Sequence, residues 1–191
     1  MKKNLVTAVW MTIVTTILLG IIYPLVVTGL AQILFPAKAN GQLLEVNSKV
    51  IGSRIIGQAF TSPRYFQPRP SAVGYDPTNS NGSQLGPTNQ KLIDRVKGDV
   101  AAAQADSPGA SVPIDLVTAS ASGFDPEISP AAAEFQIARV ARECGLSEAA
   151  LHELIVRHTT PRQWGLLGEP RVNVLELNLA LDQQVANSHR D

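Results

Sequence analysis

The stretch that decides the fold covers residues 5–35 and reads LVTAVWMTIVTTILLGIIYPLVVTGLAQILF. It holds no charged residue, and the nearest charges on its two sides are Lys3 and Lys38. A helix of roughly 20 residues crosses the apolar core of a bilayer, so this run is long enough to span a membrane. We therefore predict a tail and transmembrane helix over residues 1–35 and a separate domain over residues 36–191.

A cleaved secretory signal is the alternative interpretation of the same stretch. Lys2 and Lys3 would supply its basic start, and small residues at 29–31 or 37–39 would supply a cleavage site. The apolar part of a signal peptide, however, runs for only about 7–15 residues, which favours an uncleaved anchor. The positive-inside rule then places the short basic tail in the cytoplasm and the long following domain outside.

Small and polar residues recur at every fourth position of the expected span. The row consists of Ala8, Thr12, Thr16, Gly20, Pro24, Thr28 and Gln32. Small side chains at this spacing let two membrane helices approach closely, so we expect Thr12, Thr16 and Gly20 to contact a partner's helix. Pro24 belongs to the same expected interface, and it should bend the helix because it leaves the carbonyl of Gly20 without a donor. A featureless anchor in membrane lipid is the alternative, because small residues are common in membrane helices.

The domain over residues 36–191 is predicted to be a small mixed α+β fold outside the membrane. Its first part, to about residue 87, is expected to be extended and irregular, because glycine and proline interrupt it at short intervals. Disordered linkers contain few aromatic residues, whereas this part contains Tyr65, Phe66 and Tyr75. We therefore interpret it as an ordered surface rather than as a linker.

From residue 88 onward, apolar spacing and capping residues predict helices and one strand. The expected elements are a helix over residues 88–105, a buried strand over residues 112–117, a helix capped by Ser129 that ends at Gly145, and a short helix capped by Ser147.

Residues 173–182 are ambiguous between a strand and a helix. Leucines alternate with polar residues here, which is the period of a strand. Asn173 and Glu176, however, form a capping-box arrangement, and the segment is rich in strong helix formers. We favour a helix.

Composition and motifs argue against several classes of function. Basic and acidic residues number 16 each, so the basic excess of a nucleic-acid-binding protein is missing from the sequence. The single cysteine, Cys144, excludes an internal disulfide and every multi-cysteine metal site. The sequence also lacks a phosphate-binding loop and a dinucleotide fingerprint, so we expect no cofactor to bind to this chain alone.

Isolated polar residues offer weak candidates for catalysis and metal binding. Ser120 or Ser122 with His158 would make a nucleophile and a base, and Asp115 or Asp125 would orient the base. The serines do not lie in a nucleophile elbow, and a tight turn built from small residues is the simpler interpretation. The acidic residues nearby lack the spacing of a calcium loop, and the histidines lack that of a zinc site. We therefore predict no catalytic residue and no metal site.

Taken together, the motifs of the chain resemble those of one family. They are, in order, IGQ at 56–58, YF at 65–66, RPSA at 69–72, Tyr75, SNGS at 80–83, GPTN at 86–89, VPIDLVTASASG at 112–123, DPEISP at 125–130, Gln136 with RVA at 139–141, and VNVLELNLALD at 172–182. This set closely resembles the C subunit of the Kdp potassium-transporting ATPase, the KdpC family. The resemblance extends over essentially the whole chain, including the membrane anchor.

The resemblance implies an accessory subunit of a high-affinity, ATP-driven potassium import complex in the bacterial inner membrane, without catalysis of its own. The implied partners are a potassium-binding channel-like subunit, a P-type ATP-hydrolysing subunit and a small single-span subunit. The complex, rather than this chain, would handle ATP and potassium. The resemblance implies that the subunit is needed for assembly and stability of the complex, and in this family it has been described as a catalytic chaperone that raises the ATP affinity of the pump subunit. It has also been placed over the outer potassium entrance. A stand-alone, membrane-anchored enzyme or binding protein is the alternative.

A direct contact with ATP is not expected. Relatives discussed as assisting nucleotide binding carry a Leu-Ser-x-x-Gln stretch, whereas residues 146–150 read LSEAA and lack the glutamine. A domain outside the membrane also has no access to cytoplasmic ATP. Any effect on ATP affinity must then be transmitted through the membrane as a preference for one state of the pump.

The outer contact surface is expected to combine the aromatic and basic residues of the irregular part with its polar loop. The residues are Tyr65, Phe66, Arg69, Tyr75, Ser80, Gly82 and Ser83. The alternative is that the aromatic residues form a small hydrophobic cluster under the loop, because aromatic side chains usually bury.

Overall fold

The apolar stretch forms one continuous helix from Lys2 to Leu34 in the computed structural model, which describes residues 2–188. The helix consists of α1 (Lys2–Ile17), a π-helical turn η1 (Leu18–Ile22) and α2 (Tyr23–Leu34). It is the one helix of the described residues that is long and apolar enough to cross a membrane. None of its side chains is buried in protein, so it is not the core helix of a water-soluble domain.

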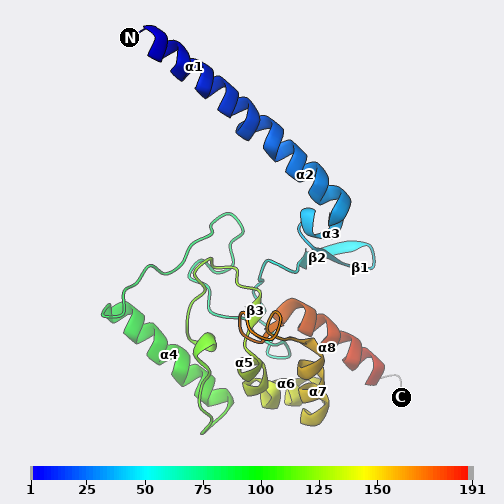
Figure 1. Cartoon of the computed structure of the whole chain (residues 1–191). Coiled ribbons are helices and arrows are strands. Elements are labelled where there is room, and N and C mark those ends of the chain that lie inside the picture. The colour runs from blue at the N-terminus through cyan, green and yellow to red at the C-terminus, as the bar shows by residue number, and fades with distance from the viewer. Residues whose placement is uncertain (1, 189–191) are drawn as a thin grey trace. The chain divides into compact units, whose positions relative to one another are not determined.

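The π-helical turn lies immediately before Pro24. Proline has no N–H to donate, so the regular hydrogen-bond ladder cannot continue past it. In η1 the N–H of Tyr23 bonds to the carbonyl of Leu18, which is the wider spacing of a π turn. The helix accommodates Pro24 through this π turn, and Figure 1 shows the span as a continuous rod, in which the expected bend is not evident.

The chain divides into two compact units, Met1–Ile51 and Gly52–Asp191. After the membrane helix the N-terminal unit continues with α3 (Pro36–Ala39) and β1 (Leu43–Val46), and β1 pairs with β2 (Lys49–Ser53). The membrane helix thus ends beside the expected residue 35, while the unit that contains it extends to Ile51.

The C-terminal unit contains the predicted mixture of helices and strands. A three-stranded antiparallel sheet has the order β3-β5-β4, with Val172 of β5 opposite both Ile128 and Thr159. The sheet consists of β3 (Glu127–Ile128), β4 (Thr159–Thr160) and β5 (Arg171–Asn173). The helices of this unit are α4 (Gln90–Asp106), α5 (Pro130–Phe135), α6 (Ile137–Cys144), α7 (Glu148–His158) and α8 (Val174–Ser188).

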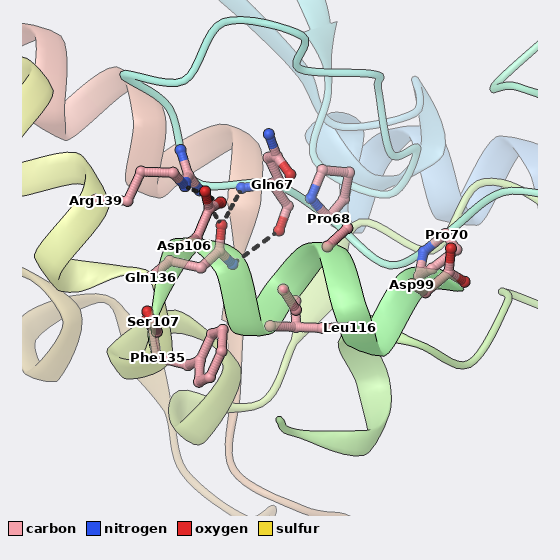
Figure 2. Close-up of a pocket in the computed structure, with 12 residues that line it drawn as sticks. Gln67, Pro68, Pro70, Asp99, Asp106, Ser107, Leu116, Phe135, Gln136 and Arg139 are labelled. Carbon is pink, nitrogen blue, oxygen red and sulfur yellow. Dashed lines mark hydrogen bonds and ion pairs between the residues drawn. The ribbon is translucent and has the colours of Figure 1, made fainter. Parts of the chain in front are cut away.

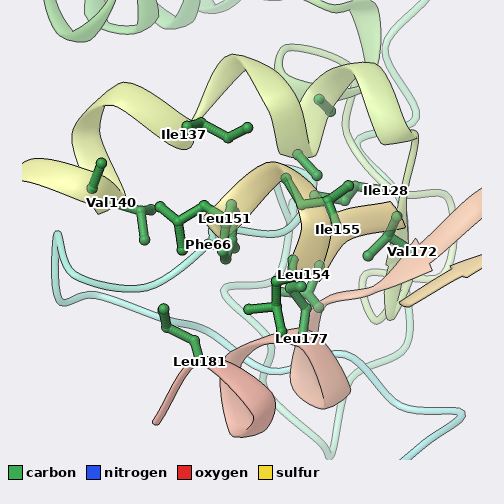
Figure 3. Close-up of a cluster of buried hydrophobic side chains, with 14 residues drawn as sticks. Phe66, Ile128, Ile137, Val140, Leu151, Leu154, Ile155, Val172, Leu177 and Leu181 are labelled. Atoms are coloured by element: carbon green, nitrogen blue, oxygen red, sulfur yellow. The ribbon is translucent and has the colours of Figure 1, made fainter. Parts of the chain in front are cut away.

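The hydrophobic core lies between α5, α6, α7, α8 and the sheet, and its side chains converge from all of them (Figure 3). The largest fully buried members include Phe66, Val140, Leu151, Ile155, Val172, Leu177 and Leu181. Burial of a side chain of this size contributes about 1.5–3 kcal/mol, so this cluster holds the unit together. By contrast, α4 has no buried residue.

The capping residues stand where the sequence predicts. The hydroxyl of Ser129 accepts a hydrogen bond from the N–H of Ala132, and that of Ser147 accepts one from the N–H of Ala150. Asn173 accepts from the N–H of Glu176 at 3.1 Å and begins α8, so the helix favoured for residues 173–182 is confirmed. The helix capped by Ser129 differs in one respect, since it breaks at Gln136 into α5 and α6.

The buried strand predicted over residues 112–117 is wrong. This segment is a loop with a 3-10 turn, η2 (Ile114–Leu116), and Ile114 is 77% exposed. Pro113 has no N–H to offer a neighbouring strand. Asp115 instead turns inward, where its carboxylate accepts hydrogen bonds from the N–H and the hydroxyl of Ser129 at 2.7 and 3.1 Å. This tertiary contact overrides the apolar pattern.

Candidate functional site

Two loops that are far apart in the sequence lock together in the C-terminal unit. We call residues 69–84 and 118–126 the interlocked loops. Ser71 and Ser120 form a parallel bridge, in which the N–H of Ser120 donates to the carbonyl of Pro70 at 2.8 Å. The hydroxyl of Ser80 donates to the carbonyl of Ser122 at 3.0 Å. The motifs RPSA, SNGS and TASASG therefore form one structural unit.

Glycine makes this close approach possible. A Cβ atom on Gly82 would lie 3.0 Å from the carbonyl oxygen of Ala121. One on Gly123 would lie 2.5 Å from a methyl group of Val73, and Gly123 also has a φ of +79°, which other residues rarely adopt. Both glycines are therefore required by the packing of one loop on the other.

Ser120 takes part in the hydrogen bonding of the turn. It is buried, and its hydroxyl oxygen accepts hydrogen bonds from the N–H groups of Gly123 and Asp125 at 3.1 and 3.2 Å. Its remaining contact is with the hydroxyl of Ser122 at 3.2 Å. The geometry is that of the tight turn, the simpler of the two interpretations of these serines.

A charged pair and a tyrosine hold the base of the interlocked loops. The Arg69 guanidinium bonds to the Asp125 carboxylate at 2.8 Å, and both side chains remain partly exposed. The hydroxyl of Tyr75 donates to the carbonyl of Arg69 at 2.6 Å. Burial, followed by the nearby charge of Asp125, raises the pKa of Tyr75 to about 12, against a lowering effect of Arg69.

Five of the expected surface residues thus lie together on or beside the interlocked loops. They are Arg69, Tyr75, Ser80, Gly82 and Ser83. An apolar cavity of about 490 Å³ lies next to them, and Ile55, Ile56 and Phe124 contribute to its walls. Ile55 and Ile56 are exposed, so this side of the unit presents apolar surface beside a charged pair.

The two other expected residues, Tyr65 and Phe66, face α8 instead. Phe66 is fully buried in the core, so its side chain offers no surface to a partner, as the alternative of a buried cluster predicts. The hydroxyl of Tyr65 donates to the carboxylate of Asp182 at 3.0 Å, and its ring makes an edge contact with Phe60. Burial, with the hydrogen bond to Asp182, raises the pKa of Tyr65.

Two side-chain amides make the backbone hydrogen bonds of residues 66–67 that a neighbouring strand would otherwise make. The side chain of Asn178 accepts from the N–H of Phe66 and donates to its carbonyl, both at 2.9 Å. Gln136 does the same for Gln67, at 2.7 and 3.1 Å. Sequence reasoning missed these roles, although a glutamine and an asparagine among apolar helix positions are a usable signal.

Arg139 fixes the preceding part of the same segment. Its guanidinium donates to the carbonyls of Pro63 and Tyr65 and to the side chain of Gln136, and it is 5% exposed. Desolvation lowers the pKa of Arg139, while the charge of Asp106, 3.4 Å away at the end of α4, opposes this effect.

A cavity of about 290 Å³ lies between this cluster and α4, beside the ion pair of Arg139 and Asp106 (Figure 2). Leu116 and Phe135 form apolar walls, and Gln67, Gln136 and Arg139 form the polar one. The polar groups are bonded to one another and to the chain, as the dashed lines in Figure 2 show. The cavity is therefore part of the interface at which α4 packs on the rest of the C-terminal unit.

Within residues 2–188 no three His, Cys, Asp or Glu side chains are placed to hold a metal ion. Cys144 donates to the carbonyl of Arg64 at 3.4 Å, and burial raises the pKa of its thiol.

Comparison with known proteins gives the family. A family model described as "K+-transporting ATPase, c chain" matches residues 5–183. The chain is 64% identical over 184 residues to the "Potassium-transporting ATPase KdpC subunit" of Koribacter versatilis (strain Ellin345), a match that covers 95% of each protein. It is 52% identical over 193 residues to the protein of the same name from Rhodospirillum rubrum, covering 99% of this chain and 100% of the relative. A match of 54% identity to the Acidobacterium capsulatum protein of that name covers 95% of this chain and 98% of the relative. The chain belongs to the KdpC family, the c chains of K+-transporting ATPases.

Proposed function

We propose that this chain is the membrane-anchored accessory subunit of an ATP-driven potassium import complex. The observation that carries the proposal is the match to relatives named as KdpC subunits, which extends over nearly the whole length of both proteins. The match includes the membrane helix as well as the C-terminal unit, since the family model spans residues 5–183. The chain itself performs no catalysis in this proposal.

The partners are a potassium-binding channel-like subunit, an ATP-hydrolysing P-type subunit and a small single-span subunit. The row of small residues on the membrane helix supports contact with another helix, and the hydroxyl of its member Thr12 is satisfied within the helix itself, by the carbonyl of Ala8 at 2.9 Å. Such hydroxyls add no unpaired polar group to a close helix contact.

The interlocked loops are the proposed contact outside the span. An apolar cavity beside a partly exposed charged pair matches the usual anatomy of an interface, in which an apolar centre is surrounded by polar groups. Placing this surface over the outer potassium entrance would let the subunit cap that entrance.

The N-terminus lies in the cytoplasm and the C-terminal unit in the periplasm in this proposal. The subunit then raises the ATP affinity of the pump without touching ATP. It does so by binding one state of the pump more tightly than another, and linkage requires that ATP in turn tighten the binding of the subunit.

Co-purification tests the proposal. The full chain is tagged, expressed with its neighbouring subunits and extracted in detergent. We expect it to elute with the ATP-hydrolysing and potassium-binding subunits in a fixed ratio. A chain that elutes alone under conditions that keep those two subunits together would support a stand-alone protein instead.

A further inference from the structure

The chain contains two asparagine–glycine pairs, Asn40–Gly41 and Asn81–Gly82. In such a pair the backbone nitrogen of the glycine can attack Cγ, the side-chain carbonyl carbon of the asparagine, because glycine has no Cβ to hinder the approach. The amide is then lost as ammonia and a carboxylate takes its place. Both asparagines are exposed, but the structure surrounds them differently.

Hydrogen bonds hold both reacting groups of the first pair in place. The side-chain amide of Asn40 donates to the carbonyl of Pro36 at 2.8 Å, and it exchanges two hydrogen bonds with the amide of Gln32, both at 3.2 Å. The N–H of Gly41 donates to the carbonyl of Lys38 at 3.2 Å. These bonds must break before the glycine nitrogen can lose its proton and reach Cγ, so the fold protects this pair.

The second pair lies in an irregular part of the interlocked loops, because residues 79–86 belong to no helix or strand. Among the hydrogen bonds of residues 2–188, none uses the N–H of Gly82, so its nitrogen is not held back from reaction. The amide oxygen of Asn81 accepts a hydrogen bond from the side chain of Gln84 at 2.7 Å. A donor at this oxygen stabilises the negative charge that develops there when a nucleophile attacks Cγ.

We propose that Asn81 is a site of spontaneous deamidation, which the fold leaves open and Gln84 activates, while Asn40 is protected. The nitrogen of Gly82 bonds to Cγ of Asn81, the bond from Cγ to the amide nitrogen breaks, and the proton of the glycine N–H leaves with that nitrogen as ammonia. Water then opens the resulting succinimide ring. Opening at Cγ leaves an aspartate, and opening at the original backbone carbonyl leaves an isoaspartate, whose main chain is longer by one carbon atom.

The packing of the interlocked loops does not accommodate this longer main chain. The hydroxyl of Ser80 bonds to the carbonyl of Ser122 at 3.0 Å. On the other side of position 81, Gly82 lies so close to Ala121 that a Cβ would come within 3.0 Å of its carbonyl oxygen. We therefore expect isoaspartate to separate the two loops, and either product adds a negative charge to them at neutral pH.

Labelling with heavy-oxygen water tests the proposal on the full chain purified in detergent. Water that opens the ring leaves its oxygen in the new carboxylate, so mass spectrometry of the digested chain counts only the residues that react during the incubation. Synthetic peptides of residues 36–45 and 77–86 give the rates of the two pairs without the fold. Relative to its peptide, we expect position 81 of the chain to react at least tenfold faster than position 40, because fewer hydrogen bonds must break.

Equal relative rates at the two positions would overturn the proposal, because the fold would then not distinguish the two pairs. An absence of label at position 81, with label acquired by its peptide, would overturn it as well.

Two variants test the chemistry at position 81. Asn81→Gln keeps the amide but needs a larger ring for the same attack, so the label at this position should disappear. Gln84→Ala removes the hydrogen bond to the reacting amide, and we expect it to slow the labelling of Asn81 several-fold. Faster or unchanged labelling in Gln84→Ala would refute the activating role of Gln84.

Thermal unfolding measures the consequence for the loops. After the same long incubation, we expect the wild type to unfold at a lower temperature than Asn81→Gln, whereas freshly prepared samples of the two should unfold alike. Equal unfolding temperatures, with position 81 of the wild type fully converted, would show that the interlocked loops tolerate the longer main chain and would refute their separation.

Discussion

At the scale of a single residue, Gly123 shows why the TASASG motif needs a glycine at its last position. Two separate constraints act on it, a positive φ and a Cβ position already occupied by Val73 and by the carbonyl of Asn81. Gly74 lies in the neighbouring loop with a φ of +61° but has open space where a Cβ would stand. Replacing each of these two glycines by alanine therefore separates the cost of the positive φ from the cost of the steric clash.

We expect Gly123→Ala to destabilise the full chain more than Gly74→Ala. The left-handed backbone costs roughly 1–2 kcal/mol in both variants. Overpacking adds about 1–3 kcal/mol in Gly123→Ala alone. Urea unfolding of the two variants in detergent measures the difference, and equal losses would show that the interlocked loops can move apart without penalty.

Tyr75 gives the C-terminal unit a dependence on alkaline pH. Its neutral hydroxyl donates to the carbonyl of Arg69, and its pKa is raised from 10.0 to about 12 in the folded protein. A raised pKa means that the stabilisation is complete below pH 10 and is lost as the pH rises through about 12.

The comparison with Tyr75→Phe isolates this effect, because Tyr65 titrates in both proteins. We expect the wild type to exceed the variant in unfolding free energy by a constant amount below pH 10, and this gap to narrow toward pH 12. A gap that stays constant throughout would mean that Tyr75 is not protected by the fold.

At the scale of elements, the contact surface proposed for the membrane helix is not required by the fold of the helix itself. Gly20 and Gly29 both have room for a side chain within the helix, since an added Cβ on Gly20 meets only a methyl group of Thr16 at 3.9 Å and one on Gly29 meets nothing. Only Gly20 belongs to the row of small residues. A larger residue at either position should therefore leave the helix and its insertion intact.

We expect Gly20→Leu to lower retention of the chain in the purified complex by roughly tenfold, because a bulky side chain separates helices that small residues bring together. Gly29→Leu serves as the matched control and should be retained like the wild type. Subunit ratios after detergent extraction give the readout. Equal retention of both variants would remove the packing role of the row.

Among the elements, local patterns in the sequence predict where helices begin, whereas contacts between distant residues cannot be predicted from them. The caps Ser129, Ser147 and Asn173 act on backbone within three residues, so local pattern was enough to place their helices. The segment 112–117 failed because Asp115 bonds to Ser129, a contact 14 residues away that no local period contains. Phe66 was misjudged as surface for a similar reason, since Asn178 holds its backbone from 112 residues away.

The candidate surface was predictable in part. Arg69, Tyr75 and the loop around Gly82 carry motifs, and the structure brings them together. The exposure of Trp164, Leu166 and Leu167 was not predicted, because exposed and buried leucines look alike in a sequence and the positive φ of Trp164 leaves no mark there.

At the scale of the whole molecule, the proposal depends on which side of the membrane the C-terminal unit occupies. Cys144→Ala removes the native thiol, and Ser188→Cys places a single reactive group on the exposed end of α8. We expect a membrane-impermeant maleimide to label this protein in intact cells. Labelling only after lysis would put the unit in the cytoplasm, where direct contact with bound nucleotide would become possible.

The effect on ATP tests the central claim most directly. The complex is purified with and without this chain, and the dependence of potassium-stimulated hydrolysis on ATP concentration is measured for both. We predict that the chain lowers the KM for ATP by roughly tenfold, within the usual range of coupling between distant sites. An unchanged KM, with the chain present in the complex at full ratio, would contradict the account.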